Sequence, residues 1–236
     1  MRKSFKPGAL TAPLPPVMVT VGDREEYNVI TIGWTGILST IPPRTYISVR
    51  PERHSFSLLN KTGEFVINLT RATQARVVDY VGIYTGAKVD KFKECKLTPV
   101  ASERVSPPTI KECPLALECK VCQVIPMGTH HVFVADIVSV SCDEEIIDEN
   151  GKICFDRAGL LAYAHGEYYA LGEKLGSFGF SAKKTKKEGT GVRKASVKGR
   201  EERKQTDNEK KPFYLSAPRG RGQSGKGKRG KGGSKK

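Results

Sequence analysis

One short segment combines two cations with a predicted helix start. Arg50, Pro51, Arg53, His54 and Ser55 follow a strand-like run and open a short helical pattern. Unpaired N–H groups at a helix N-terminus attract anions, and arginine adds charge-assisted hydrogen bonds. The segment therefore predicts an anion site suited to a phosphate. The same residues also fit an exposed helix that Ser55 caps and whose arginines are solvated, and the sequence leaves both interpretations open.

The strand before this segment offers polar groups and one flat ring. Residues 27–33 are rich in β-branched side chains and carry Asn28 and Thr31, and Trp34, the only tryptophan, follows directly. Together with the anion site, they suit a ligand with a phosphate at one end and a planar ring at the other. A single tryptophan also fits a core or interface position, so its role as a ligand contact stays one of two interpretations.

The cysteine and histidine pairs give weak evidence for metal or redox chemistry. Cys119 and Cys122 form a CxxC, but a tetrahedral zinc site needs four ligands and no second pair follows. Positions three apart on a strand face opposite sides, which favours two unrelated buried thiols. His130 and His131 fit a loop pair before a strand. We therefore predict no metal site.

His165 lies beside a glycine in the run AHGEYYALG, where a bend near a ligand is one interpretation and a core or surface histidine the other. Familiar phosphate and nucleophile motifs are missing: no GxGxxG follows a predicted strand, and the sequence has no GxxxxGK[ST] or GxSxG. A phosphate site in this chain must have a different design, and no catalytic nucleophile is predicted.

The predicted elements are mostly strands. Two short helices are expected at 55–61, ending at Gly63, and at 73–80, and a long loop at 82–106. The expected strands are 16–22, 27–33, 44–49, 64–69, 115–124, 131–141 and 160–171. Many short strands with few helices are typical of a β-barrel or sandwich, so the fold class is mainly β.

Charge divides the chain into two regions. Half of the 40 basic residues, but only 5 of the 25 acidic ones, lie in 181–236. Residues 1–180 are therefore neutral and form the predicted folded domain, whereas 181–236 form a Lys/Gly-rich basic tail that we expect to be disordered. This tail fits either a solubilising extension or weak, salt-sensitive binding to a polyanion.

Composition also bounds the environment. The chain opens without an apolar run and contains no stretch long enough to span a membrane. A reducing cytoplasm with free thiols is the expected location. The six cysteines concerned are Cys95, Cys113, Cys119, Cys122, Cys142 and Cys154.

The order of these features resembles the flavin reductase-like family, whose members have the FMN-binding split barrel, and the flavoredoxin-type branch most closely. The resemblance covers about residues 6–176. It rests on NVITIGWTG at 28–36, Ser39, Pro42-Pro43, ISVRP at 47–51, RHS at 53–55, GEFVINL at 63–69, DKF at 90–92 and HGEYYALG at 165–172.

The resemblance implies an FMN site at a homodimer interface. Residues at the end of the first conserved strand would border the isoalloxazine ring, and those at the helix entry would hold the phosphate. Two asparagines would add polar contacts, a Lys-Phe pair would close over the ligand, and the late histidine would approach the ring. The implied contacts are Asn28, Thr31, Gly33, Trp34, Thr35, Val49, Arg50, Arg53, His54, Ser55, Asn68, Lys91, Phe92 and His165.

The expected activity is hydride transfer from NAD(P)H to flavin, or electron passage from a redox protein through bound FMN. The flavin would carry that chemistry, so no acid–base dyad is required. A non-catalytic FMN-binding protein, and a polyanion-binding protein whose barrel is a scaffold, are the alternatives.

Overall fold

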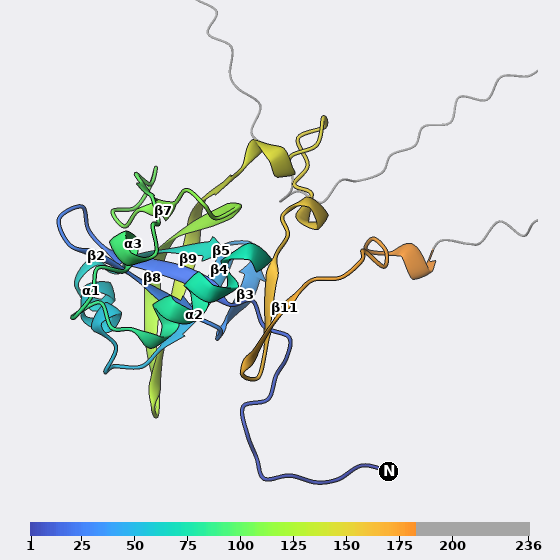
Figure 1. Ribbon diagram of the computed structural model, residues 1–236, viewed down its shortest axis with the longest axis horizontal. Coiled ribbons are helices and arrows are strands. Elements are labelled where there is room, and N and C mark those ends of the chain that lie inside the picture. Colours follow the sequence, from blue (N-terminus) through green and yellow to red (C-terminus); the bar gives the residue numbers. More distant parts are fainter. Residues whose placement is uncertain (183–236) are drawn as a thin grey trace, which may run out of the picture.

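The protein is built around one seven-stranded antiparallel sheet (Figure 1). The computed structural model describes residues 1–182. The strand order is β2-β1-β5-β8-β9-β4-β3, and every pairing is antiparallel. The strands are β1 (Val17–Gly22), β2 (Tyr27–Ile32), β3 (Thr35–Thr40), β4 (Pro43–Val49), β5 (Glu64–Leu69), β8 (Leu115–Met127) and β9 (His130–Cys142). The predicted mainly-β class is confirmed.

The two edges of this sheet are joined by only two residues. β2 and β3 lie at opposite ends of the strand order, yet Gly33 and Trp34 alone separate them in the chain. The sheet must therefore roll up until its edges meet. The Ser48 amide donates to the Trp34 carbonyl at 3.0 Å, which continues the β3–β4 pairing as far as Trp34. This bond fixes the backbone position of Trp34 beside β4.

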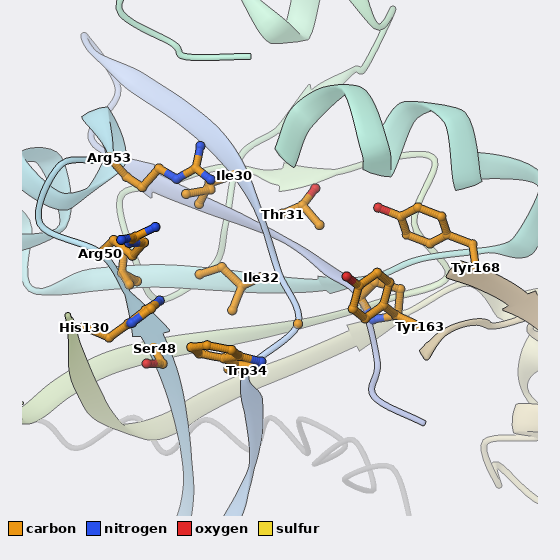
Figure 2. A pocket seen from close by; sticks show the side chains of 13 residues that line it. Ile30, Thr31, Ile32, Trp34, Ser48, Arg50, Arg53, His130, Tyr163 and Tyr168 are labelled. Carbon is orange, nitrogen blue, oxygen red and sulfur yellow. The ribbon is translucent and has the colours of Figure 1, made fainter. Parts of the chain in front are cut away.

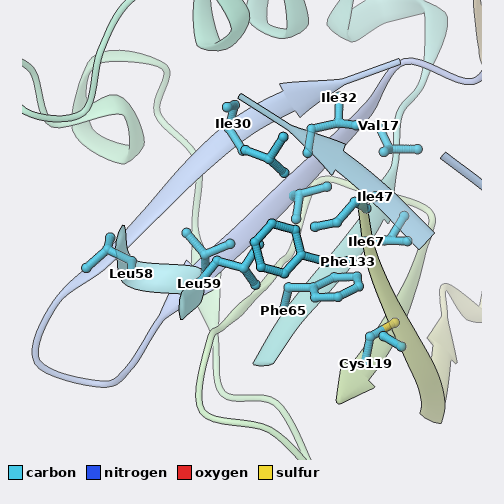
Figure 3. Close-up of a cluster of buried hydrophobic side chains, with 14 residues drawn as sticks. Val17, Ile30, Ile32, Ile47, Leu58, Leu59, Phe65, Ile67, Cys119 and Phe133 are labelled. Carbon is cyan, nitrogen blue, oxygen red and sulfur yellow. The ribbon is translucent and has the colours of Figure 1, made fainter. Parts of the chain in front are cut away.

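The barrel encloses an aliphatic and aromatic core (Figure 3). Phe65, Phe133 and Ile47 are fully buried at its centre, and Leu59 from helix α1 (His54–Thr62) covers one end. Their burial removes large apolar areas from water, which is the main stabilising contribution to such a fold.

A second layer covers the outer face of β1 and β2. It contains α2 (Ala75–Ile83), α3 (Lys91–Glu94) and the β10–β11 hairpin (Leu161–Ala164 and Glu167–Ala170), packed over Met18 and Val29. Because β1 is buried on both faces, its sequence is apolar at most positions, with the buried Thr20 as the polar exception, and shows no alternation. The remaining elements are η1 (Ala72–Gln74), β6 (Pro99–Val100), β7 (Thr109–Ile110), η2 (Glu144–Ile146), η3 (Phe155–Arg157) and η4 (Phe180–Ala182).

Helix α1 agrees with the prediction at one end and differs at the other. Gly63 ends it in the left-handed conformation, with φ of 64°, as the sequence predicts. The alternative interpretation, in which Ser55 caps the N-terminus, is wrong: the N-cap is Arg53, without a side-chain cap bond. Ser55 is buried inside the first turn, where its Oγ accepts a hydrogen bond from Asn28 Nδ2 at 2.8 Å.

Two further differences concern segments expected to be loops. β3 was not predicted, because Ile37 and Leu38 both face solvent and the strand lacks alternation; its pairing with β4 defines it. The expected loop at 82–106 contains α3 and β6. No helix among residues 1–182 is long and apolar enough to cross a membrane. The predicted disorder of 181–236 concerns almost entirely residues outside the described range.

Candidate functional site

A cavity of about 280 Å³ opens at the junction between β2 and β3, and we name it the Trp34 cavity. Trp34 lies in the two-residue connection between β2 and β3. Its ring lies at the cavity wall and is 43% exposed. Figure 2 shows arginines at one end of the cavity and tyrosines at the other. The lining residues are Pro16, Ile30, Thr31, Ile32, Gly33, Trp34, Ser48, Val49, Arg50, Arg53, His130, Tyr163 and Tyr168.

The arginine end of the Trp34 cavity lies where β4 leads into α1. Arg50 directly follows β4, is exposed, and has Glu52 3.8 Å from its Nε. Arg53 is the N-cap residue of α1, and its Nη1 donates to the Gly82 carbonyl at 3.2 Å. The other guanidinium N–H groups of these two side chains are available to an anion beside the free N–H groups of α1.

Beside the arginine end, Trp34 pairs with a histidine from the β8–β9 hairpin. The rings of Trp34 and His130 are tilted at 48° with centroids 4.6 Å apart, and His130 Nδ1 lies 2.9 Å from Thr129 Oγ1. Burial and the nearby Arg50 cation lower the pKa of His130, which favours the neutral ring. The pair offers a planar, apolar contact to a flat ligand.

The β10–β11 hairpin supplies the third wall. Tyr163 and Tyr168 pack with centroids 5.3 Å apart, and Tyr163 is held by backbone hydrogen bonds in both directions with Leu14. The Tyr168 hydroxyl donates to Asp79 Oδ1 on α2. Burial and the Asp79 carboxylate raise the pKa of Tyr168 to about 12, so this tyrosine remains a neutral hydrogen-bond donor.

A second cavity of about 450 Å³ lies beyond the first turn of α1, and we name it the Tyr27 cavity. Residues 53 and 54 are consecutive, but Arg53 lines the Trp34 cavity and His54 lines the Tyr27 cavity. A Cβ atom at Gly86 would lie 2.3 Å from Asn28 Oδ1, so only glycine permits this wall. Its residues are Glu25, Glu26, Tyr27, Asn28, His54, Gly86, Lys88, Val89, Asp90, Lys91 and Phe92.

Lys91, at the base of the Tyr27 cavity, is already bound by the protein. It is 3% exposed, and its Nζ donates to the carbonyls of Val29 and Val81 at 2.8 Å each. Burial, with a smaller contribution from the Arg53 charge, lowers the pKa of Lys91 to about 8. These bonds connect α3 with β2 and α2.

The structure divides the residues that the sequence singles out into three groups. Thr31, Gly33, Trp34, Val49, Arg50 and Arg53 line the Trp34 cavity. Asn28, His54, Lys91 and Phe92 line the Tyr27 cavity. Thr35, Ser55, Asn68 and His165 line neither cavity.

Members of the third group have other partners. Thr35 Oγ1 donates to the Tyr46 carbonyl. Asn68 is fully buried, donates to the Met18 carbonyl and accepts from the Ile110 amide. His165 is exposed in the turn between β10 and β11, with φ of 49°. Their contact with a ligand stays a prediction.

Four polar or aromatic lining residues were not selected from the sequence: Ser48, His130, Tyr163 and Tyr168. His130 reaches the cavity only because the long β8–β9 hairpin pairs with β4, nearly ninety positions away in the chain. Tyr163 and Tyr168 flank His165 in the sequence, and His165 was selected from the sequence as the ligand contact in this segment. In the β10–β11 hairpin Tyr163 and Tyr168 are cross-strand partners. Reading this segment as a hairpin around His165-Gly166 would have placed the two tyrosines on the same face.

The CxxC thiols face different environments. Cys119 is buried in the barrel core, as predicted, but the prediction of a second buried thiol is wrong because Cys122 is exposed. Within residues 1–182, no group of three His, Cys, Asp or Glu side chains is arranged to hold a metal ion.

The family model for the flavin reductase like domain matches residues 10–172. This chain belongs to the flavin reductase-like family. Its fold is similar to that of flavoredoxin from Desulfovibrio vulgaris (Miyazaki F), with a TM-score of 0.72, 32% identity, and coverage of 78% of this chain and 100% of that one. The predicted split barrel is therefore confirmed.

Other relatives of this flavin reductase-like chain agree. A protein from Archaeoglobus fulgidus is 34% identical over 129 residues, which are 55% of this chain and 72% of the relative. The FMN-binding protein from Thermus thermophilus shares the fold, with a TM-score of 0.63, 24% identity, and coverage of 75% of this chain and 99% of that one. Membership of this family supports a flavin-related redox role.

Proposed function

We propose that this flavin reductase-like protein is an FMN-dependent oxidoreductase whose Trp34 cavity holds the flavin. One observation carries the proposal: a single cavity combines the Trp34–His130 ring pair with the cations Arg50 and Arg53. FMN has a planar ring at one end and a dianionic phosphate at the other, so its two chemistries match the aromatic and the cationic side chains of this cavity.

The residues present fit FMN in this cavity. Arg50, Arg53 and the first-turn N–H groups of α1 would hold the phosphate, and the aromatic wall around Trp34 would hold the ring. Gly33 leaves the wall open, since even a Cβ atom there would have only Tyr163 within 4 Å, at 3.9 Å. When bound, flavin supplies the hydride and electron chemistry, and the protein supplies orientation and charge.

NAD(P)H is the proposed electron donor, stacking transiently at the exposed part of the cavity. The support is the exposure of Trp34 and the absence of any predicted separate nicotinamide motif. An electron carrier that takes electrons from another redox protein is the second candidate, favoured by the 32% identity to a flavoredoxin.

An anaerobic spectroscopic titration tests the proposal. Purified protein is saturated with FMN, and NADH or NADPH is added while the flavin absorbance near 450 nm is followed. Bleaching by a nucleotide supports the reductase, whereas a bound flavin that stays oxidised favours the carrier or a non-catalytic FMN-binding protein. Failure to bind FMN would contradict the proposed function itself.

The proposal includes a homodimer with the flavin near its interface. Large apolar side chains are exposed on β3 and on the β8–β9 hairpin, close to Trp34, and surfaces of this kind commonly mark interfaces. They include Ile37, Leu38, Val124, Ile125 and Met127. Light scattering on the eluting protein gives the mass that tests this.

Residues 181–236 and the cellular location complete the proposal. The 20 basic residues of that region support weak polyanion contact, which binding to a nucleic acid at low and high salt would check. All six cysteines are unpaired, which supports a reducing cytoplasm.

A further inference from the structure

We propose that an apolar groove beside the β1–β2 turn binds residues 210–215 of the protein's own C-terminal region. The groove has a volume of about 350 Å³, and we name it the Val100 groove. The docking is independent of flavin binding, because the groove and the Trp34 cavity share no lining residue. The lining residues of the groove are Asp23, Arg24, Tyr27, Pro99, Val100, Ala101, Ser102, Val105, Ser106 and Pro108.

The groove exposes apolar side chains that neither the proposed flavin site nor the proposed dimer interface uses. Val100 is 42% exposed and Tyr27 is 38% exposed, and Pro99 beside Val100 is exposed as well. The Tyr27 ring is held edge-on against Phe92, with centroids 5.0 Å apart, so its position is fixed. Exposed apolar surface of this kind commonly marks a site that another segment of protein covers.

Hydrogen bonds hold one wall of the groove, residues 102–108, against the barrel. The Pro108 carbonyl accepts a bond from Thr20 Oγ1 on β1. The Ser106 amide donates to Glu64 Oε2 on β5 at 2.8 Å. Because this wall is ordered before anything binds, little conformational entropy is lost there when a segment docks.

The β1–β2 turn at the rim of the groove is acidic. Residues 23–26 hold three carboxylates and one arginine, and one of the carboxylates, Asp23, already binds Lys61. Glu25 and Glu26 are exposed and form no ion pair within the part of the chain that the structure describes. These two carboxylates are therefore available to cations beside a docked apolar segment.

One segment beyond the described residues has the complementary sequence. In residues 183–236, the only aromatic residues and the only leucine occur together, in KKPFYL at 210–215. The apolar part of this segment suits the Val100 groove, and its two lysines suit the free carboxylates of the turn. The family match ends at residue 172, so the segment is a feature of this chain outside the family domain.

The connection is long enough for docking within one chain. Residues 183–209 can span at most about 95 Å, whereas a folded domain of this size has a radius of gyration of only about 16 Å. Covalent tethering raises the effective concentration of such a segment to the order of millimolar. A modest apolar contact is therefore sufficient, and docking would hold the basic residues that follow close to the barrel.

Hydrogen exchange of the full chain, followed by mass spectrometry, tests the docking at the groove. The amides of residues 99–108 should exchange about tenfold faster in Phe213→Ser/Leu215→Ser than in the unaltered protein, because a docked segment protects them. Val192→Ser/Val197→Ser is the matched control, since it removes the only two valines of the same region. This control should leave the exchange unchanged.

Chymotrypsin gives the reciprocal measurement on the segment, since it cleaves after aromatic residues and leucine. Cleavage within residues 213–215 should be about tenfold faster in Val100→Lys, because proteolysis follows the population of the undocked state. Val138→Lys is the control, since Val138 is 38% exposed and lines neither cavity nor the groove. Thermal unfolding checks that both variants keep the fold.

Faster exchange in the segment variant together with faster cleavage in the groove variant supports the docking. No change in either measurement would overturn it, and a change in only one would place the segment elsewhere on the protein. Protection that disappears on about hundredfold dilution would assign the groove to another copy of the chain and overturn docking within one chain. FMN affinity should be the same in all four variants, so a failure of docking and a failure of the proposed function are separate results.

Discussion

The Trp34 cavity and the Tyr27 cavity flank the same helix turn, but their polar groups differ in one respect. At the Trp34 cavity, Arg50 is exposed and Arg53 donates one hydrogen bond to the Gly82 carbonyl. At the Tyr27 cavity, Lys91 makes two backbone hydrogen bonds and Asn28 binds Ser55. Arg50, which has only exposed Glu52 nearby, and Arg53 still offer guanidinium N–H groups to a ligand in the first cavity, whereas the second has a floor of polar groups that the fold already uses.

This difference separates binding from stability. Removing a polar group that is available to a ligand lowers the ligand affinity and leaves the fold intact. Removing one that is already bonded leaves its buried partner unsatisfied and lowers the unfolding free energy. Substitutions of available groups should therefore change ligand affinity and not unfolding free energy, and substitutions of bonded groups should do the reverse.

The largest effect is expected for Arg50→Ala/Arg53→Ala. FMN affinity should fall about a hundredfold, because charge-assisted bonds to the phosphate are lost. Riboflavin, which has no phosphate, should bind the variant and the unaltered protein equally. Fluorescence titrations with both ligands measure this, and an equal loss for riboflavin would argue that the arginines act on the ring or on the fold.

A substitution at Asn68 should act on stability instead. Asn68→Ala leaves the buried Ile110 amide without its acceptor and should lower the unfolding free energy by about 2 kcal/mol. Urea unfolding measures the change, and FMN affinity of the folded variant should stay the same. A tenfold weaker affinity at unchanged stability would place Asn68 among the ligand contacts instead.

The lowered pKa of Lys91 should make the stability of the protein depend on pH. Its pKa is about 8 in the fold and near 10.5 when unfolded, so the unfolded chain binds more protons between these values. The stability of the unaltered protein relative to Lys91→Met should therefore rise from pH 8 to 10.5, by roughly 1–2 kcal/mol after solvent screening. Unfolding at pH 7 and 10 measures it; a flat difference would contradict the buried position.

The smallest effect is expected at the aromatic wall. Trp34→Leu should weaken FMN and riboflavin alike, by about fivefold, since it removes a stacking face worth roughly 1 kcal/mol. This equal loss for both ligands is the opposite of the arginine pattern. A loss confined to FMN would mean that Trp34 serves the phosphate end.

The sequence predicts well what depends on local pattern. β-branched runs predict β2 and β5, and Gly63 predicts the end of α1, because strand propensity and left-handed backbone are properties of a few neighbouring residues. The arginines at the start of α1 are also predictable from local sequence, since the helix start and these arginines lie within one segment.

What the sequence misses depends on distant neighbours. His130 meets Trp34 only through the pairing of β9 with β4, and β3 is a strand by virtue of its partner. The sequence also cannot distinguish an available lysine from a bonded one, since the acceptors of Lys91 are carbonyls of β2 and α2. The free or bonded state of a polar group is a property of the fold.

The position of Trp34 allows a direct test of the central claim that flavin binds against it. Trp34 is the only tryptophan, so all tryptophan emission reports on this wall. The account predicts saturable quenching as FMN is added, reaching a plateau at one FMN per chain and requiring far more FMN in Arg50→Ala/Arg53→Ala. FMN binding that leaves the emission unchanged would place the flavin elsewhere and contradict the account.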